Sequence, residues 1–401
     1  MPVNAVEEIK RHNAGREPER LLLKYQKMRS NPFVFMRGAC HLFYARLPSI
    51  TLFKSAPLVW ACGDLHLENF GSYKGDNRLT YFDLNDFDEA ALVPASWELV
   101  RMLTSILVSA PSLSINPAEA TALCKIYLRS YAQAVGAGKA YWVERETAQG
   151  QIRDLLVSLQ DRQRSAFLRD RTQLKGKRRV LKIDGKRTLI ADPAQHQAVA
   201  AFMKKFALKQ SQPAFFKLLD VARRVAGTGS LGVERYTLLV QGKGGLGGHY
   251  LLDFKQSLPS SLAPHFASLQ PAWASEAQRV VQVQRRMQAV SVALLAPVKF
   301  EGNPFVLREL QPQQDRLVLG AANKCGDSLK TTIATMGQML AWAQLRSAGQ
   351  SGSANVDDLM AFGQRKKWQA KLLTAASRCA ELVAQDAAAF NTAFDAGQLR
   401  A

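Results

Sequence analysis

One short segment, residues 60–90, concentrates acidic side chains together with a His and an Asn that suit metal binding or proton transfer. It holds seven carboxylates, although the whole chain has a formal net charge of +20. Carboxylates crowded in this way destabilise a fold unless a cation neutralises them, so the segment predicts a divalent metal ion. The side chains concerned are Asp64, His66, Glu68, Asn69, Asp76, Asp83, Asp86, Asp88 and Glu89.

The spacing inside this segment favours phosphoryl transfer. Asp64 and Asn69 lie five positions apart in a predicted loop, and a short predicted strand at residues 78–82 leads to a second acidic loop, DLNDFDEA. Kinase-type enzymes use an Asp to orient the acceptor hydroxyl, and an Asn with a later Asp to hold magnesium against the phosphates. We therefore predict Asp64 as a catalytic residue with His66 near it, and Asn69 and Asp86 as magnesium ligands.

Two alternatives stay open for the acidic segment. Asp83 is the alternative to Asp86 as the magnesium ligand. A carboxylate-rich surface loop, or a structural calcium site, is the alternative to a catalytic site. The segment lacks the glycine-containing spacing of an EF-hand, which argues against the calcium interpretation.

A second pattern, much later in the chain, suits the covering of a nucleotide. Gly227, Gly229 and Gly232 form a GxGxxG sequence, which alone is a weak signal. Here the glycines lead into a predicted strand rather than a helix, and a glycine-rich turn and another strand follow, with Lys255 on that last strand. This order predicts that the amides of the loop face phosphate and that Lys255 pairs with the phosphates of ATP. A hairpin with a flexible glycine turn is the alternative.

The helix predicted from residues 276 to 295 follows at the place where a kinase presents a Glu to that Lys. Glu276 is the only acid in it, and Gln282 is the other candidate for the position. If Gln282 faces Lys255, the ion pair expected of a kinase is absent.

The next predicted strand begins at residue 305 and ends in a short polar connection. In a kinase this connection is the hinge, so we predict that Glu309, Leu310 and Gln311 lie beside the base of the nucleotide. Earlier in the chain, Arg37 stands on a predicted core-packed helix, at residues 31–47. It can clamp a phosphate or a carboxylate of the acidic segment, and a structural salt bridge is an equal alternative.

The composition points to a globular protein with polyanionic partners. With 53 Lys and Arg against 33 Asp and Glu and a pI near 9.9, the chain favours nucleotides, nucleic acid or anionic lipid headgroups, or it is simply a basic solvated surface. No apolar run is long enough to span a bilayer and the N-terminus is polar, so we expect a cytoplasmic protein. Five scattered cysteines without a CxxC pair predict reduced thiols and argue against a zinc site.

A dense group of cations occupies residues 169–189, around a predicted hairpin turn at IDGK. Nucleic-acid binding here is possible in principle, but the segment lacks the aromatic residues that stack on bases. Contact with an acidic or phosphorylated substrate is a second option. A solvated hairpin is the favoured interpretation.

The order of these patterns is the reverse of the usual one, because kinase-like enzymes place the glycine-rich loop before the acidic catalytic loop. Circular permutation, tolerated where chain ends lie close together, explains this better than coincidence. We predict three parts: residues 1–170 with the catalytic and metal loops, 171–311 as a β-rich nucleotide-covering part, and 312–401 as a helical return to the first part.

GDLHLEN and NDFDEA resemble two loops of the kinase-like superfamily, in its aminoglycoside phosphotransferase and choline kinase branch. There the pattern reads HGDLHxxN and then IDFxDA, and Cys62 replaces the first His. Asp86 is preferred over Asp83 because NDFDEA matches the metal loop and Glu98 then falls where those kinases carry an acid opening the next helix.

A closer resemblance covers roughly residues 20–390 and is specific in its motifs. SNPFVFMRGA, WACGDLHLENFG, YFDLNDFDEA, RRVAGTGSLGVERY, LLDFKQS, QRVVQVQRRMQ and VLREL, in this order, look like the bacterial family known as domain of unknown function 2252. The resemblance implies a kinase-like relative and no established activity. The chain departs from the family pattern at Gln282, where a Glu is usual, and at Gln344, where a His is common.

Together these patterns predict an α+β, two-lobed protein-kinase-like fold with circularly permuted element order. The predicted function is phosphoryl transfer from ATP with Mg²⁺ to a hydroxyl, of a small molecule rather than a protein. Transfer of AMP on the same fold is one alternative, and a non-catalytic basic regulator that binds nucleotides or polyanions is another. Nucleic acid is a possible partner that the sequence does not favour.

Overall fold

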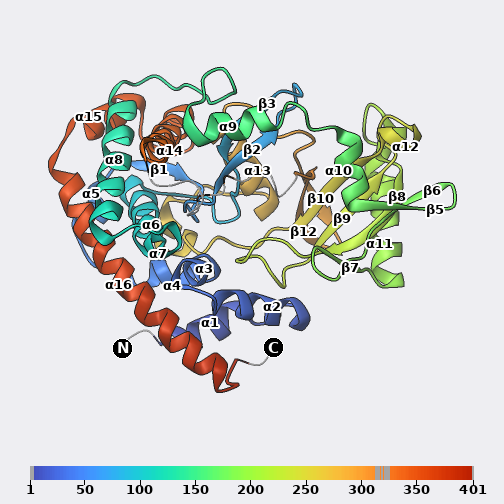
Figure 1. The fold of residues 1–401 in the computed structure, drawn as a ribbon, viewed down its shortest axis with the longest axis horizontal. Helices are drawn as coiled ribbons and strands as arrows, with labels where there is room; N and C mark the ends of the chain where they lie inside the picture. Colours follow the sequence, from blue (N-terminus) through green and yellow to red (C-terminus); the bar gives the residue numbers. More distant parts are fainter. Residues whose placement is uncertain (1–3, 312–316, 318, 320–325, 400–401) are drawn as a thin grey trace.

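The computed structural model describes residues 4–311, 317, 319 and 326–399. They form an α+β protein in which a helical part lies beside a part built on a six-stranded antiparallel sheet (Figure 1). This confirms the predicted α+β class. We call the segments 164–256 and 296–309 the sheet part and the other described residues the helical part.

The helical part begins with five helices that precede the acidic segment and ends with three that follow the sheet part. The first group is α1 (Ala5–Asn13), α2 (Pro18–Met28), α3 (Pro32–Gly38), α4 (Cys40–Ala45) and α5 (Leu52–Ser55). The middle group, after the acidic segment, is α6 (Ala95–Val108), α7 (Ala110–Leu113), α8 (Pro117–Gly136) and α9 (Gly150–Ser158). Between the two segments of the sheet part, the chain returns to the helical part with the 3-10 helix η2 (Ala263–Leu269) and α13 (Glu276–Met287). The last group is α14 (Asp327–Arg346), α15 (Val356–Gln364) and α16 (Lys367–Asp395).

Two short antiparallel pairs carry the acidic segment. The strand β1 (Leu58–Ala61) pairs with β4 (Ala91–Pro94), and β2 (Phe70–Lys74) pairs with β3 (Thr80–Leu84). The acidic loops are the connections between these strands: the first acidic loop is residues 62–69 and the second is residues 85–90. The first loop joins β1 to β2 and the second joins β3 to β4. Because β1 pairs with β4 and β2 pairs with β3, the two loops lie side by side.

The six-stranded sheet runs in the order β11, β12, β10, β9, β8, β7. Its strands are β7 (Thr188–Ile190), β8 (Leu218–Arg224), β9 (Arg235–Val240), β10 (Tyr250–Gln256), β11 (Ala296–Phe300) and β12 (Asn303–Glu309). The helix α11 (Pro193–Ala207) packs on the sheet, and the 3-10 helix η1 (Pro213–Phe216) contacts α11. The part also contains α10 (Arg164–Arg171), α12 (Gly245–Gly248) and the hairpin β5 (Thr172–Lys175) to β6 (Arg178–Leu181).

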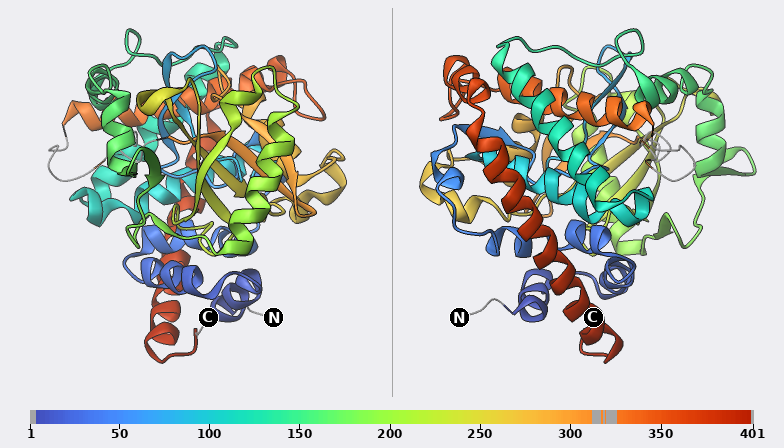
Figure 2. Two further views of the ribbon diagram at one scale, coloured as in Figure 1. Left: turned by 90° about the vertical axis from the view of Figure 1, so that its right-hand side faces the viewer. Right: turned by 60° about the vertical axis from the view of Figure 1, so that its left-hand side comes forward.

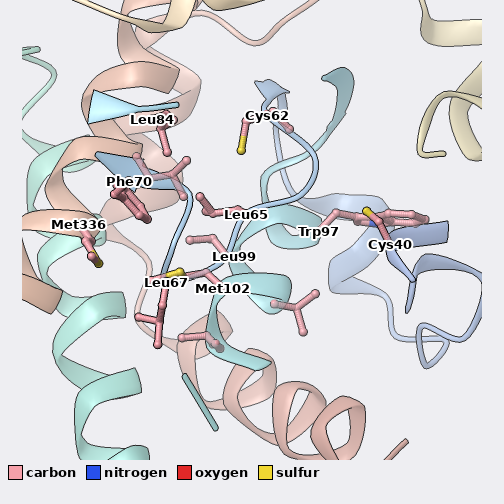
Figure 3. Packing of buried hydrophobic residues seen from close by; sticks show 14 of the residues in the cluster. Cys40, Cys62, Leu65, Leu67, Phe70, Leu84, Trp97, Leu99, Met102 and Met336 are labelled. Atoms are coloured by element: carbon pink, nitrogen blue, oxygen red, sulfur yellow. The ribbon is translucent and has the colours of Figure 1, made fainter. Parts of the chain in front are cut away.

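The main hydrophobic core gathers residues from both ends of the chain. It includes α6, which is buried on nearly all sides, with α8 and α16 packed against it and α14 packed on α8. Leu65 and Leu67 of the first acidic loop belong to this core, together with Leu99 and Met102 of α6 (Figure 3). Burial of these alternating leucines fixes the path of the loop, because each buried Leu side chain contributes about 1.5–3 kcal/mol. A second core, centred on Phe254 and neighbouring aromatic rings, lies between the sheet and α11.

The two ends of the described chain lie on the same side of the molecule (Figure 2). The helix α1 packs against α16, and Arg29, just after α2, donates from Nε to Oδ1 of Asp395 at 2.6 Å.

Some predicted elements differ from those observed. The helix predicted at residues 31–47 is two helices with a break at Ala39. The predicted hairpin turn at IDGK is wrong: the hairpin closes between Lys175 and Arg178. The IDGK residues instead form a loop in which Asp184 accepts hydrogen bonds from the amides of residues 186–188. Among the helices of the described residues, none has both the length and the apolar composition needed to cross a bilayer.

Candidate active site

A cleft of ≈ 150 Å³ lies where the two acidic loops face the sheet part. It brings together most of the predicted site residues although they are far apart in sequence. Those that line it are Arg37, Asp64, His66, Asn69, Asp86, Gly227, Gly229, Lys255 and Gln311. Asp83, Gly232, Glu309 and Leu310 do not line it.

Gly63, the second residue of the first acidic loop, stands at a position that only a glycine can occupy. Its φ is +87°, and a Cβ there would lie 2.0 Å from the carbonyl oxygen of Glu89. The two acidic loops can therefore approach each other only because this side chain is absent. The carbonyl of Gly63 accepts a hydrogen bond of 2.6 Å from the hydroxyl of Tyr44, which fixes the loop from the other side.

A buried carboxylate anchors the start of the same loop. Glu98, in the first turn of α6, accepts hydrogen bonds from the amides of Cys62 at 2.7 Å and Gly63 at 3.3 Å. Gln344 of α14 donates to Glu98 at 3.3 Å and accepts from the hydroxyl of Tyr131 at 2.6 Å. Burial raises the pKa of Glu98, and these donors oppose the rise. Gln344, where the family pattern commonly has a His, thus supports the anchor of the first acidic loop.

Asp64 is held by an arginine that the sequence reasoning missed. Arg101 of α6 is fully buried, and its Nε donates to Oδ1 of Asp64 at 2.9 Å while a second nitrogen contacts the same oxygen. That second nitrogen also donates to the carbonyl of Met36 at 3.0 Å. The signal was present in the sequence, because a single Arg three positions after Glu98 in an otherwise apolar helix must find a buried partner.

Asn69 joins the two acidic loops. Its Nδ2 donates to the carbonyls of Asp64 at 3.1 Å and Asp86 at 3.2 Å, and its Oδ1 accepts from the amide of Asp86 at 2.8 Å. Its Oδ1 also accepts from the amide of Asn85 at 3.4 Å, so a metal ion bound to this oxygen would replace the longer of the two hydrogen bonds. His66 is buried beside these groups, where its Nδ1 accepts from the amide of Glu68 at 3.1 Å.

The two candidate magnesium ligands have different surroundings. Asp83 is buried, accepts from Arg346 at 3.2 Å and from the amides of Leu84 and Ala289, and lies outside the cleft. Asp86 lines the cleft, and in the described part of the chain it has no ion pair; its carboxylate accepts from the amide of Asp88 at 3.3 Å. The geometry therefore agrees with Asp86 rather than Asp83 as a cation ligand.

Lys255 crosses the cleft to the second acidic loop. It lies on β10 and forms an ion pair with Asp88. Burial lowers the pKa of Lys255 to about 8, and the nearby carboxylate of Asp86 opposes this. Neither Glu276 nor Gln282 of α13 pairs with Lys255. Glu276 pairs with Arg279 at 2.6 Å, and the partly buried Gln282 forms no hydrogen bond with Lys255, which pairs with Asp88 instead.

The glycine-rich loop is fastened by the N-terminal helices. Arg16 donates to the carbonyls of Gly229 at 2.6 Å and Leu231 at 3.0 Å, and the buried Lys24 also donates to Gly229, at 3.1 Å. Gly232 packs against Arg16 and is not among the residues that line the cleft. Arg37 lies next to Gly229 of the glycine-rich loop, and its side chain pairs with Glu68 of the first acidic loop.

The predicted hinge residues are mostly engaged within the protein. The amide of Glu309 donates to the carbonyl of Ala293 at 3.0 Å, and that of Leu310 donates to Leu251 at 2.8 Å. The Glu309 side chain pairs with Arg78, and Leu310 is buried. Of the three, Gln311 alone lines the cleft. Residues 312–316, which follow it, lie outside the described part of the chain.

Three further arginines line the cleft and were also missed. Arg224, Arg235 and Arg308 come from three different strands and surround the buried Asp253. In sequence they look like ordinary strand charges, because only the pairing of strands brings them together.

The cleft offers oxygen donors for a metal ion without forming a closed metal site. Among the described residues, no three His, Cys, Asp or Glu side chains converge into a ready-made metal site. The oxygens of Asp64, Asn69 and Asp86 nevertheless line one side of a single cleft, and oxygen ligands with retained waters suit Mg²⁺. The residues therefore fit a magnesium ion that arrives with phosphates.

The described chain is thus an α+β protein with a polar cleft between its helical and sheet parts. It belongs to the family described as "Uncharacterized protein conserved in bacteria" (DUF2252), whose model matches residues 16–393. The predicted family is therefore confirmed over most of the chain. Comparisons with curated proteins and with solved structures found no match.

Proposed function

We propose that the protein is a phosphotransferase that uses MgATP to phosphorylate a hydroxyl of a small molecule. One observation carries the proposal: the cleft brings Asp64, Asn69 and Asp86 together on one side with Lys255 and the glycine-rich loop on the other. Phosphoryl transfer needs acidic side chains that hold a metal ion and, opposite them, cationic side chains that hold phosphate, and this cleft has both.

The strand order supports a kinase-like, circularly permuted fold. The strands β8, β9 and β10 are consecutive antiparallel neighbours, with the glycine-rich loop between the first two and Lys255 on the third. The strand β12 pairs with β10, and α13 precedes the β11–β12 pair and packs on it. The acidic loops come earlier in the chain, and the neighbouring chain ends support permutation.

Each residue has a role that follows from its contacts. Asp64, oriented by Arg101, would accept the proton of the acceptor hydroxyl. Asn69 and Asp86 would hold magnesium, and Lys255 would leave Asp88 to contact phosphate, with Arg37 and His66 beside the acceptor. Bound MgATP would supply the transferable phosphoryl group and neutralise charge on its oxygens. The likeness of GDLHLEN and NDFDEA to the loops of the aminoglycoside phosphotransferase and choline kinase branch supports a small acceptor.

The test is thermal unfolding with and without MgATP, on the wild type, Asp86→Ala and the control Asp154→Ala. Asp154 is exposed on α9, away from the cleft. At about 100 times the Kd a ligand stabilises by about 2.7 kcal/mol, so the wild type and the control should shift and Asp86→Ala should not. No shift at millimolar MgATP in the wild type would overturn the proposal. Product analysis then separates phosphoryl transfer, which yields ADP, from AMP transfer, which yields pyrophosphate.

A further inference from the structure

Four cations from four strands form one side of the cleft. We call Arg224 of β8, Arg235 of β9, Lys255 of β10 and Arg308 of β12 the cationic wall. Arg235 lies directly opposite Lys255 in the strand register, and Arg308 lies opposite Asp253. All four therefore project from the same face of the sheet.

The cationic wall is short of negative charge. Its three arginines share Asp253: Arg235 contacts both carboxylate oxygens at 2.5–2.7 Å, Arg224 contacts one at 2.9 Å, and Arg308 stands at 3.5 Å. The other contact of Arg308 is a long one, 3.4 Å, to the carbonyl of Asn85. One carboxylate cannot satisfy three guanidinium groups, each of which has several N–H donors. Burial and the neighbouring arginines lower the pKa of Arg224 to about 9, which agrees with this shortage.

The cleft offers much less to a purine base. The amides of Glu309 and Leu310, at the predicted hinge, already donate to backbone carbonyls. Within the described residues, the rings that line the cleft are the imidazoles of His12 and His66, and the apolar lining is limited to Ala226, Val233, Leu258 and Pro259, with Cys40. In the described part of the chain, a purine base thus finds no Phe, Tyr or Trp to stack on and no free amide at Glu309 or Leu310.

We propose that the cationic wall sets the choice of phosphoryl donor, so that the cleft binds the polyphosphate chain of the donor and is indifferent to its base. This rests on the proposed phosphotransferase function and names its donor class. Guanidinium groups bind phosphate oxygens through paired, charge-assisted hydrogen bonds. Here the phosphate chain of the donor would supply the negative charge that Asp253 alone does not give to the three arginines. ATP, GTP and inorganic tripolyphosphate are then equivalent ligands.

The first test is isothermal titration calorimetry of the full chain with MgATP, MgGTP and magnesium tripolyphosphate. We expect Kd values within about fivefold of one another, a difference of about 1 kcal/mol. Binding of MgATP more than about fiftyfold tighter than both other ligands would overturn base indifference and leave the proposed function intact. Absence of binding by all three would instead contradict the proposed function itself.

The second test removes one cation. Arg308→Gln should weaken all three ligands by the same factor, about tenfold for the loss of a charge-assisted contact. Arg145→Gln, at an exposed ion pair with Glu146 outside the cleft, is the matched control and should change none of them. Arg308→Lys keeps the charge and guards against misfolding, with an intermediate loss expected. Unchanged affinities in Arg308→Gln, or a loss confined to MgATP, would contradict the proposal.

Discussion

The two sides of the cleft carry opposite charges and are held in opposite ways. In the first acidic loop the helical part supports both the side chain and the backbone: Arg101 holds Asp64, and Glu98 holds the amides of the loop. On the cationic wall a single carboxylate, Asp253, serves three arginines. The acidic side is thus fixed atom by atom, whereas the cationic side is a concentration of charge with one shared counter-ion.

This difference separates geometry from affinity. A group that must accept a proton needs a fixed position, since small displacements cost large factors in rate. A phosphate chain needs charge and N–H donors, which tolerate small shifts of the ligand. We therefore expect changes on the acidic side to affect turnover and changes on the cationic wall to affect binding and stability, and the following predictions test that division.

The largest effect is expected for Asp64→Asn. The amide keeps an acceptor for Arg101 but cannot take the proton of the acceptor hydroxyl, so turnover should fall by about 10²–10⁴-fold. The Kd for MgATP, measured by calorimetry, should stay close to that of the wild type. A variant with full turnover would remove Asp64 from catalysis; a variant with lost binding would show that the two sides are not separable.

The next effect concerns stability, at Asp253→Asn. Removing one partner of a buried ion pair costs about 3–5 kcal/mol, here because three arginines lose their counter-ion. The arginines hold the pKa of Asp253 well below its usual 3.8. The carboxylate therefore stabilises the fold fully at pH values above 3.8, and this stabilisation is lost as the pH falls from 3.8 toward the lowered pKa. Urea unfolding of both proteins should show a constant difference from pH 7 to 5 that shrinks below pH 4. Tripolyphosphate should restore part of the loss.

A smaller effect is expected from pH on binding at Lys255. Because burial lowers its pKa to about 8, the charged form that attracts phosphate is lost as pH rises through that value. The affinity for MgATP should be constant below pH 7 and fall above pH 8 by up to about tenfold per pH unit. Lys255→Arg keeps its charge and should give a flat profile. A wild-type profile that is flat to pH 10 would contradict the assigned contact.

The smallest effect is expected in the hairpin of β5 and β6. Lys175, Lys177 and Arg178 are exposed and outside the cleft, so changing all three to Gln should leave MgATP binding unchanged. Binding of nucleic acid at low salt, if present, should weaken, with a salt dependence reduced by about 0.7–0.9 for each lost phosphate contact. A loss of MgATP affinity larger than that of Arg308→Gln would show that the wall does not set donor binding.

The acidic side could be predicted from the sequence because its groups are nearly contiguous. Asp64, Asn69 and Asp86 lie within one segment and between short strands, so their spacing alone indicated a common site. Their supports could be anticipated only in part. A charged pair in an apolar helix, Glu98 and Arg101, signals burial but does not name its partner.

The cationic wall could not be predicted, because strand register decides it. Arg224 and Arg308 are more than eighty positions apart, and only the pairing of β8, β9, β10 and β12 places both at Asp253. The partner of Lys255 was missed for a similar reason. A kinase pattern directs attention to α13, while the folded chain places Asp88 of the second acidic loop closer.

The order of the chain has a consequence for its synthesis on the ribosome. The strands β7–β12 lie in one continuous stretch, residues 188–309, and their contacts can form as soon as that stretch emerges. The helical part cannot close so early, because α6 packs against α16 and α8 against α14, and both of these partners follow the sheet stretch in sequence. The acidic loops are thus translated before the sheet, whereas the helical packing beside them is completed only after the sheet has been synthesised.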